Sequence, residues 1–256
     1  MIFRRSKKRS DEQELDAAPE PVDDDLEGDA AGPEEARASD GEAGSELSPL
    51  DLEALDAGEW RGEGPFDITE VDEDDDLAGT PEMPRIDLGA MVLAGFPGAE
   101  LRLQMSEETQ QIVSAMLIHG DSALELGAYA APRSGGLWAE LREEIMAAAT
   151  EAGGTASLAE GPFGVELRRL IPVSTPEGEQ GYQPSRMWVA EGPRWLLRGI
   201  VYGQAALEDD LEGAAGEMLA AFRSVIVRRS EEAMAPGDLL SLTMPPNLVP
   251  TDEGAV

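Results

Sequence analysis

The chain has 256 residues, 53 acidic and 19 basic side chains, a formal net charge of −34, and no cysteine. The missing cysteine excludes disulfides, thiolate zinc sites and a cysteine nucleophile. The charge disfavours direct binding to nucleic acid or to an anionic membrane surface, because like charges repel. No apolar run reaches the ~20 residues of a membrane span, so no transmembrane segment is predicted.

The charge is concentrated in the first third of the chain. Residues 11–82 contain 28 acidic and two basic side chains, whereas nine of the twelve aromatic residues follow residue 83. A segment with so few apolar groups cannot offset the entropy lost on ordering. We therefore predict that residues 1–82 form a disordered acidic arm. Its first nine residues are basic, but acidic residues follow them, so export is not predicted and the expected location is the cytoplasm.

Two places in the arm carry apolar residues. Ser48–Leu55 is compatible with a short helical turn, and Trp60 and Phe66 are candidate anchors. Sparse apolar residues in an acidic arm dock on the chain's own domain or on a partner, or stay in unbound coil. The sequence leaves these alternatives open.

The remaining residues predict an α+β domain over 83–230. Strands are expected from alternating or continuous apolar runs. Their ranges are 85–96, 99–105, 111–119, 122–130, 155–159, 164–172, 187–190 and 224–227. Amphipathic stripes predict helices over 137–152, ended by Gly153, and over 207–222. Short polar turns between successive strands favour a mostly antiparallel sheet with two main helices packed on it.

One stretch, Gly192–Gly203, is expected to be the central strand. It is entered through a Gly-Pro turn, and its apolar residues point in both directions. Trp195, Leu197 and Val201 share one face, and apolar residues at 196, 200 and 202 share the other. A strand that is apolar on both faces is covered on both. Residues 231–256 are expected to be an extended tail packed on the domain, with its last residues disordered.

The sequence contains few candidates for catalytic or metal-binding residues. His119 lies in a turn beside Asp121, without a recognisable nucleophile, and a single histidine does not make a histidine metal site. The acidic run at 72–76 lacks the glycine and glutamate of a calcium-binding loop. Phosphate-loop, dinucleotide-binding and nucleophile-elbow patterns are absent from the sequence. We therefore predict no enzyme activity, no cofactor and no metal.

Four residues are candidates for binding a ligand or partner: Arg133, Arg194, Trp195 and Arg198. Arg133 precedes a glycine-rich turn at a helix start, where an anion is readily held. Arg194, beside an aromatic ring, is suited to grip a carboxylate or to stack on a base. The competing interpretation is that these arginines pair with the chain's own carboxylates.

From Gly64 onward the chain resembles an uncharacterised actinobacterial family of cytoplasmic proteins, a domain of unknown function. The segments that carry this resemblance are Gly64–Asp67, Arg85–Gly89, Ala131–Trp138, Gly161–Leu167, Gly192–Gly203 and Phe222–Arg228. The resemblance implies an α+β sandwich similar to the Mog1/PsbP-like fold, which serves mostly adaptor and assembly proteins. It implies no activity.

Three functions remain open. The leading hypothesis is a non-catalytic cytoplasmic interaction or adaptor protein, with a protein partner held by the arm anchors or by a sheet edge. The second is a small-anion or nucleotide-binding domain that uses the Arg133, Arg194 and Trp195 site. The third, and weakest, is a carboxylate-based hydrolase, for which no pair of carboxylates stands out.

Overall fold

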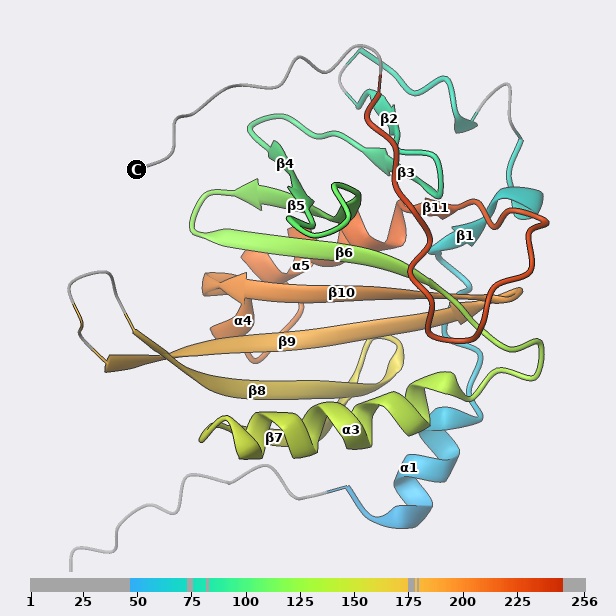
Figure 1. The fold of residues 1–256 in the computed structure, drawn as a ribbon. Coiled ribbons are helices and arrows are strands. Elements are labelled where there is room, and N and C mark those ends of the chain that lie inside the picture. The colour runs from blue at the N-terminus through green and yellow to red at the C-terminus, as the bar shows by residue number, and fades with distance from the viewer. Residues whose placement is uncertain (1–46, 73–75, 82, 175–177, 179, 246–256) are drawn as a thin grey trace, which may run out of the picture. The chain divides into compact units, whose positions relative to one another are not determined.

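The computed structural model describes residues 47–72, 76–81, 83–174, 178 and 180–245 (Figure 1). The helices are α1 (Pro49–Asp56), α3 (Leu137–Glu151), α4 (Gln204–Leu207) and α5 (Gly213–Arg223), with a 3-10 turn η1 (Ile68–Glu70). The strands are β1 (Phe66–Asp67), β2 (Arg85–Asp87), β3 (Met91–Ala94), β4 (Glu100–Met105), β5 (Ile112–His119), β6 (Ser122–Ala130), β7 (Thr155–Gly161), β8 (Gly164–Ser174), β9 (Gln180–Gly192), β10 (Trp195–Gly203) and β11 (Ile226–Val227).

A seven-stranded antiparallel sheet dominates the fold, with the strand order β4-β5-β6-β10-β9-β8-β7. Two meanders, β4 to β6 and β7 to β10, are joined by the antiparallel pairing of β10 with β6. The turn between β9 and β10 is Pro193-Arg194, in which Arg194 has φ +65°. Proline followed by a left-handed residue is the pattern of a type II turn. The predicted α+β class with a mostly antiparallel sheet is confirmed.

Strand β10 is the middle strand of this sheet, as its sequence predicts. Trp195, Leu197 and Val201 belong to one core cluster, and Leu196 and Ile200 belong to another on the opposite face. All five side chains are buried. Their alternation follows from the two-residue period of a strand, so the assignment of faces from the sequence holds residue by residue.

A smaller sheet with the order β1-β11-β3-β2 contributes to the first of these clusters. Strand β1 runs parallel to β11, and the other pairs are antiparallel. The single strand predicted over 85–96 is wrong, because the chain folds there into the β2–β3 hairpin. Gly89 turns the chain with φ +81°, and its N–H donates to Asp87 Oδ1 at 2.8 Å.

The helix predicted over 207–222 begins too early, because α4 ends at Leu207 and α5 starts only at Gly213. The chain leaves the helical conformation at Glu208, whose φ and ψ are −74° and 132°. The Glu208 carbonyl accepts a hydrogen bond from Arg186 Nη1 at 2.8 Å, and its carboxylate accepts one from the N–H of Ala215 at 2.8 Å. A carboxylate is stabilised at a helix N-terminus. Glu208 therefore binds the first turn of α5 through its side chain instead of continuing α4.

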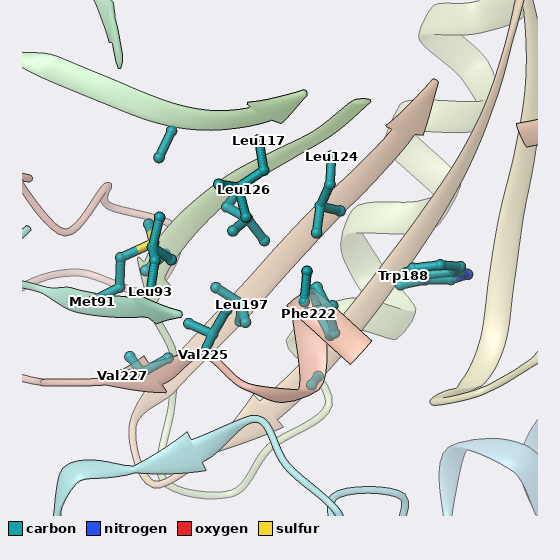
Figure 2. Packing of buried hydrophobic residues seen from close by; sticks show 14 of the residues in the cluster. Met91, Leu93, Leu117, Leu124, Leu126, Trp188, Leu197, Phe222, Val225 and Val227 are labelled. Atoms are coloured by element: carbon teal, nitrogen blue, oxygen red, sulfur yellow. The ribbon is translucent and has the colours of Figure 1, made fainter. Parts of the chain in front are cut away.

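The helices lie on opposite faces of the large sheet (Figure 1). Residues of α5 and the small sheet pack with β6 and β10 in the larger core cluster, where Figure 2 shows Phe222 near Leu124 and Leu197. Gly199 makes room there, since a Cβ atom would lie 2.6 Å from the Phe222 ring. Helix α3 packs along β7 and β8 on the other face. It contributes Leu137 and Trp138 to the second cluster.

Folded structure begins well before residue 83, where the sequence placed the domain boundary. Ser48 and Asp51 form a capping box at the start of α1, with Ser48 N donating to Asp51 Oδ2 at 3.1 Å. Arg142 of α3, whose side chain is only 8% exposed, donates two hydrogen bonds to Asp56 at 2.5 and 2.6 Å. The predicted arm therefore contributes residues 47–72 to the folded unit, while its residues 1–46 lie outside the described part.

The C-terminal segment runs beside β6. The Leu240 N–H donates to the Ala128 carbonyl at 2.8 Å, and the side chains of Leu240 and Leu242 are buried in the larger core cluster. Residues 246–256 of the predicted tail lie outside the described residues. Among the helices that are described, none is both long and apolar enough to cross a membrane.

Candidate functional site

The segment 60–70 forms a junction with the start of β10. Trp195 is fully buried, and its indole Nε1 donates to Asp67 Oδ2 at 2.7 Å. The Arg61 guanidinium lies 5.0 Å from the centroid of the Trp195 ring, a cation–π geometry. Arg61 also donates to both carboxylate oxygens of Glu70 at 2.9 and 3.0 Å. These hydrogen bonds hold the pKa of Glu70 below its ordinary value.

The two predicted anchors, Trp60 and Phe66, dock on the chain's own domain. Trp60 Nε1 donates to the Leu55 carbonyl at 2.7 Å, and the indole lies against Gly164 at the start of β8. The Phe66 N–H donates to the Val225 carbonyl at 2.9 Å, which sets β1 beside β11. Of the alternatives left open by the sequence, the structure shows the intramolecular one.

A cavity of about 130 Å³ lies beside this junction. Its lining includes Trp60, Arg61, Trp138, Phe163 and Glu191. Pockets that hold drug-sized ligands are typically about 300–1,000 Å³. This cavity is therefore too small for a molecule of that size, although a hollow of about 570 Å³ is also lined by Trp60, Arg61 and Phe66.

The start of α3 is already occupied by a carboxylate of the chain. Glu191 accepts hydrogen bonds from the backbone N–H groups of Gly136 at 2.7 Å and of Trp138 at 2.8 Å. These are the donors that make a helix N-terminus attractive to anions. Arg133 is exposed in the preceding loop and forms no ion pair with another described residue. The anion position expected beside Arg133 is therefore filled by Glu191.

The structure does not bring the four predicted binding residues together. Trp195 is closed off by Arg61 and Asp67, so its ring is not a free stacking surface. Arg198 projects from the opposite face of β10, because it is an odd number of residues from Trp195. Arg194 is in the hairpin turn, where its carbonyl accepts from the N–H of Ala131 at 3.0 Å. A combined Arg and Trp site is therefore not formed.

Sequence reasoning missed a buried ionic cluster on the α5 side of β8 and β9. The Glu166 side chain is fully buried and accepts hydrogen bonds from Arg186 at 2.9 and 3.0 Å and from Trp188 Nε1 at 2.6 Å. Arg168 Nε adds a fourth at 2.8 Å. The available signal was Glu166 itself, a charged residue between the apolar neighbours Val165 and Leu167. Buried charges require partners of this kind.

A second polar group, also missed, lies on the α3 side of the sheet. Arg198 is stacked over the Tyr129 ring, with its guanidinium 5.0 Å from the ring centroid. The Tyr202 hydroxyl donates to Glu125 Oε2 at 3.2 Å. Burial, and then the nearby Glu125 charge, raise the pKa of Tyr202 to about 12. Burial likewise lowers the pKa of Arg169.

His119 forms a surface pair. Its Nδ1 lies 2.8 Å from Glu217 Oε2, and its ring packs edge-on against Phe96. Across the described ranges, no group of three or more histidine, cysteine, aspartate or glutamate residues is arranged to hold a metal ion.

These features define an α+β protein built on one large antiparallel sheet, with part of its acidic N-terminal region docked against the start of the central strand. The chain belongs to the family described as "Protein of unknown function (DUF3710)", which matches residues 64–251. The resemblance to an uncharacterised domain family is thereby confirmed. The match begins at Gly64, inside the predicted arm, which agrees with the early start of folded structure.

No curated protein matches the chain. Among solved structures, the chain is similar to cyanobacterial PsbP (CyanoP) from Synechocystis sp. PCC 6803, with 12% sequence identity and a TM-score of 0.35. The similarity covers 58% of this chain and 94% of that one. At this TM-score the likeness carries no argument about function.

Proposed function

We propose that this is a non-catalytic cytoplasmic protein that binds a protein partner through a projecting hairpin formed by β8 and β9. The observation that carries the proposal is an uncharged, exposed stretch at the end of this hairpin, defined here as residues 170–174 and 180–184. We call it the projecting ribbon.

The ribbon extends past its neighbours in the sheet. Pairing of β7 with β8 ends at Leu170, and pairing of β10 with β9 ends at Ser185. From Ile171 to Ser174, β9 is the only one of the described strands that pairs with β8. Figure 1 shows this hairpin reaching beyond the other strands. A two-stranded ribbon is only marginally stable by itself, and its free edges present unpaired backbone groups.

The side chains of the ribbon are unusual for this chain. Charged residues make up 28% of the sequence, yet residues 170–174 and 180–184 contain none. Tyr182 is 61% exposed, Leu170 40% and Val173 37%. By register, Leu170 and Tyr182 share one face with Pro172 and Pro184. The cores of protein interfaces are depleted of charge and enriched in tyrosine, which favours a protein partner here.

The contacts of Trp60 and Phe66 favour the projecting ribbon as the surface that binds a partner. Trp60 and Phe66, the first candidates for holding a partner, contact the chain's own domain. Binding a partner through them would require these contacts to be broken. The projecting ribbon presents apolar side chains to a partner without breaking these contacts.

The test is capture of partners from a lysate of the native host by the full-length chain, followed by a binding titration with each purified candidate. We expect the double variant Leu170→Ser, Tyr182→Ser to bind at least tenfold more weakly than the wild type. The matched control is Leu50→Ser, which changes a leucine 77% exposed on α1.

The proposal is overturned if no protein binds, or if the double variant keeps full affinity. Circular dichroism and the unfolding temperature establish that the double variant is folded. The cytoplasmic location is tested separately by fractionation of the native host.

A further inference from the structure

Two arginines from non-adjacent strands point to the same face of the large sheet. Arg169 of β8 is in register with Ser185 of β9, which is in register with Tyr202 of β10. Arg198 lies on this face because it is four residues before Tyr202. With Tyr129, these five residues define what we call the arginine face. Of these five residues, only Arg198 was a candidate from the sequence, where it was grouped with Trp195.

The positive charge of the arginine face is only partly neutralised by the carboxylates that the structure describes. Glu125 is the carboxylate whose charge acts on Arg169 and Tyr202, and its Oε2 accepts a hydrogen bond from the Tyr202 hydroxyl. In the described part of the chain, no carboxylate oxygen lies within ion-pair distance of Arg169 or Arg198. Two guanidinium cations therefore share one carboxylate, in a chain whose formal net charge is −34.

Both arginines also hold a buried donor without a partner. The Nε atoms of Arg169 and Arg198 are buried, and neither has a hydrogen-bond partner among the described residues. Native proteins satisfy most buried polar groups, so an unsatisfied one calls for a bound ion, ligand or water. Arg229 Nε is in the same condition, but that side chain uses its terminal nitrogens on Ser230 and Glu232.

No described helix covers β10, the strand that carries Arg198 and Tyr202, on this face (Figure 1). Helix α3 packs along β7 and β8, and in Figure 1 no described helix crosses β6 or β10 on this side of the sheet. Arg198, Tyr202 and Tyr129 are partly exposed. Arg169, on the strand that α3 packs along, is also partly exposed, so a small molecule can contact both arginine side chains.

We propose that the arginine face binds a small molecule bearing a phosphate group, held by Arg169 and Arg198 with the Ser185 hydroxyl as a further donor. Arginine forks match phosphate oxygens geometrically and remain charged at physiological pH. A phosphate offers more acceptor oxygens than a carboxylate does, which suits donors that come from two separate arginines and one hydroxyl. This site is distinct from the projecting ribbon.

The probes are inorganic phosphate and phenyl phosphate, titrated into the full-length chain by calorimetry with potassium chloride of equal ionic strength as the reference. We expect saturable binding of both. Arg169→Gln and Arg198→Gln should each weaken it at least tenfold, and the double variant should abolish it. The matched control is Arg133→Gln, which removes an exposed arginine from the loop before α3 and should leave binding unchanged.

A second measurement needs no variant. Phenylglyoxal modifies accessible arginines, and the sites are read by mass spectrometry. Phosphate should slow modification of Arg169 and Arg198 in the wild-type chain and leave Arg133 unaffected. The proposal is overturned if neither probe binds saturably, if the double variant binds as the wild type does, or if phosphate protects all three arginines equally.

Discussion

Replacing Glu166 with glutamine should destabilise the protein more than any exposed charge substitution. The Glu166 carboxylate has no exposure to solvent and accepts hydrogen bonds from Arg186, Trp188 and Arg168. The Arg186 side chain is itself only 3% exposed. Glutamine keeps the shape of the side chain but removes the charge, and Arg186 is then left buried without a counter-ion.

Breaking a buried ion pair on one side costs about 3–5 kcal/mol. For a folded unit of this size, each kcal/mol shifts the unfolding temperature by about 2–4 °C, so Glu166→Gln should lower it by roughly 6–20 °C. Urea unfolding followed by tryptophan fluorescence should show a lower midpoint with an unchanged m-value.

The matched control is Glu160→Gln, on the neighbouring strand β7, where the residue is exposed. Its unfolding midpoint should equal that of the wild type. The double variant Glu166→Leu, Arg186→Met removes both charges and should recover part of the loss, though not all, because Trp188 Nε1 loses its acceptor. Equal midpoints for Glu166→Gln and the wild type would refute the assignment of Glu166 as the buried counter-ion.

Three further predictions concern other parts of the fold. Because the pKa of Tyr202 is raised to about 12, this residue stabilises the folded state below pH 10, and the contribution is lost between pH 10 and 12. The loss of stability at alkaline pH should therefore be smaller in Tyr202→Phe. A pH profile of stability identical to that of the wild type would contradict this. Asp67→Ala leaves the Trp195 indole N–H unpaired and should cost about 1–3 kcal/mol in urea unfolding, whereas an unchanged midpoint would show that this hydrogen bond is dispensable. Gly203 has φ +74°, and in Gly203→Ala the new Cβ lies against the Asp121 carbonyl, so this variant should lose at least about 1–3 kcal/mol of unfolding free energy. Gly181→Ala, with open space at its Cβ, should not lose stability. Equal unfolding temperatures for the two variants would count against the strain at Gly203.

Much of the large sheet follows from local patterns. The two-residue alternation of Gly192–Gly203 assigns each β10 side chain to its face, and the apolar residues on both faces place the strand in the centre. Gly153-Gly154 ends α3 for an equally local reason, since the chain can take a positive φ there. The end of α4 at Glu208 could not be predicted from a local pattern, because the hydrogen bonds of Glu208 are made with Arg186 and with the start of α5.

The docking of residues 47–72 could not be predicted from the composition of this segment. An average over an acidic segment predicts that it cannot form a core, and this segment forms none by itself. Its order depends on contacts supplied by the domain, such as Trp195 beneath Arg61 and Arg142 beside Asp56. These pairs are separated by more than eighty residues in sequence, so no local pattern marks them.

The candidate site was missed for a related reason. Sequence proximity grouped Arg198 with Trp195, although strand alternation sends residues an odd number apart to opposite faces. The partner that the fold gives to Arg198 is Arg169, two strands away. That relation depends on the register of β8, β9 and β10, which the sequence does not specify.

The projecting ribbon and the arginine face share strands β8 and β9, and they meet at consecutive residues. Arg169 belongs to the arginine face, whereas Leu170 points to the opposite side with Tyr182. A partner that covers Leu170 and Tyr182 therefore leaves Arg169 accessible on the other side of the sheet. Because Leu170→Ser and Arg169→Gln act on opposite faces, loss of partner binding and loss of phosphate binding are separable, and either proposal can fail without the other.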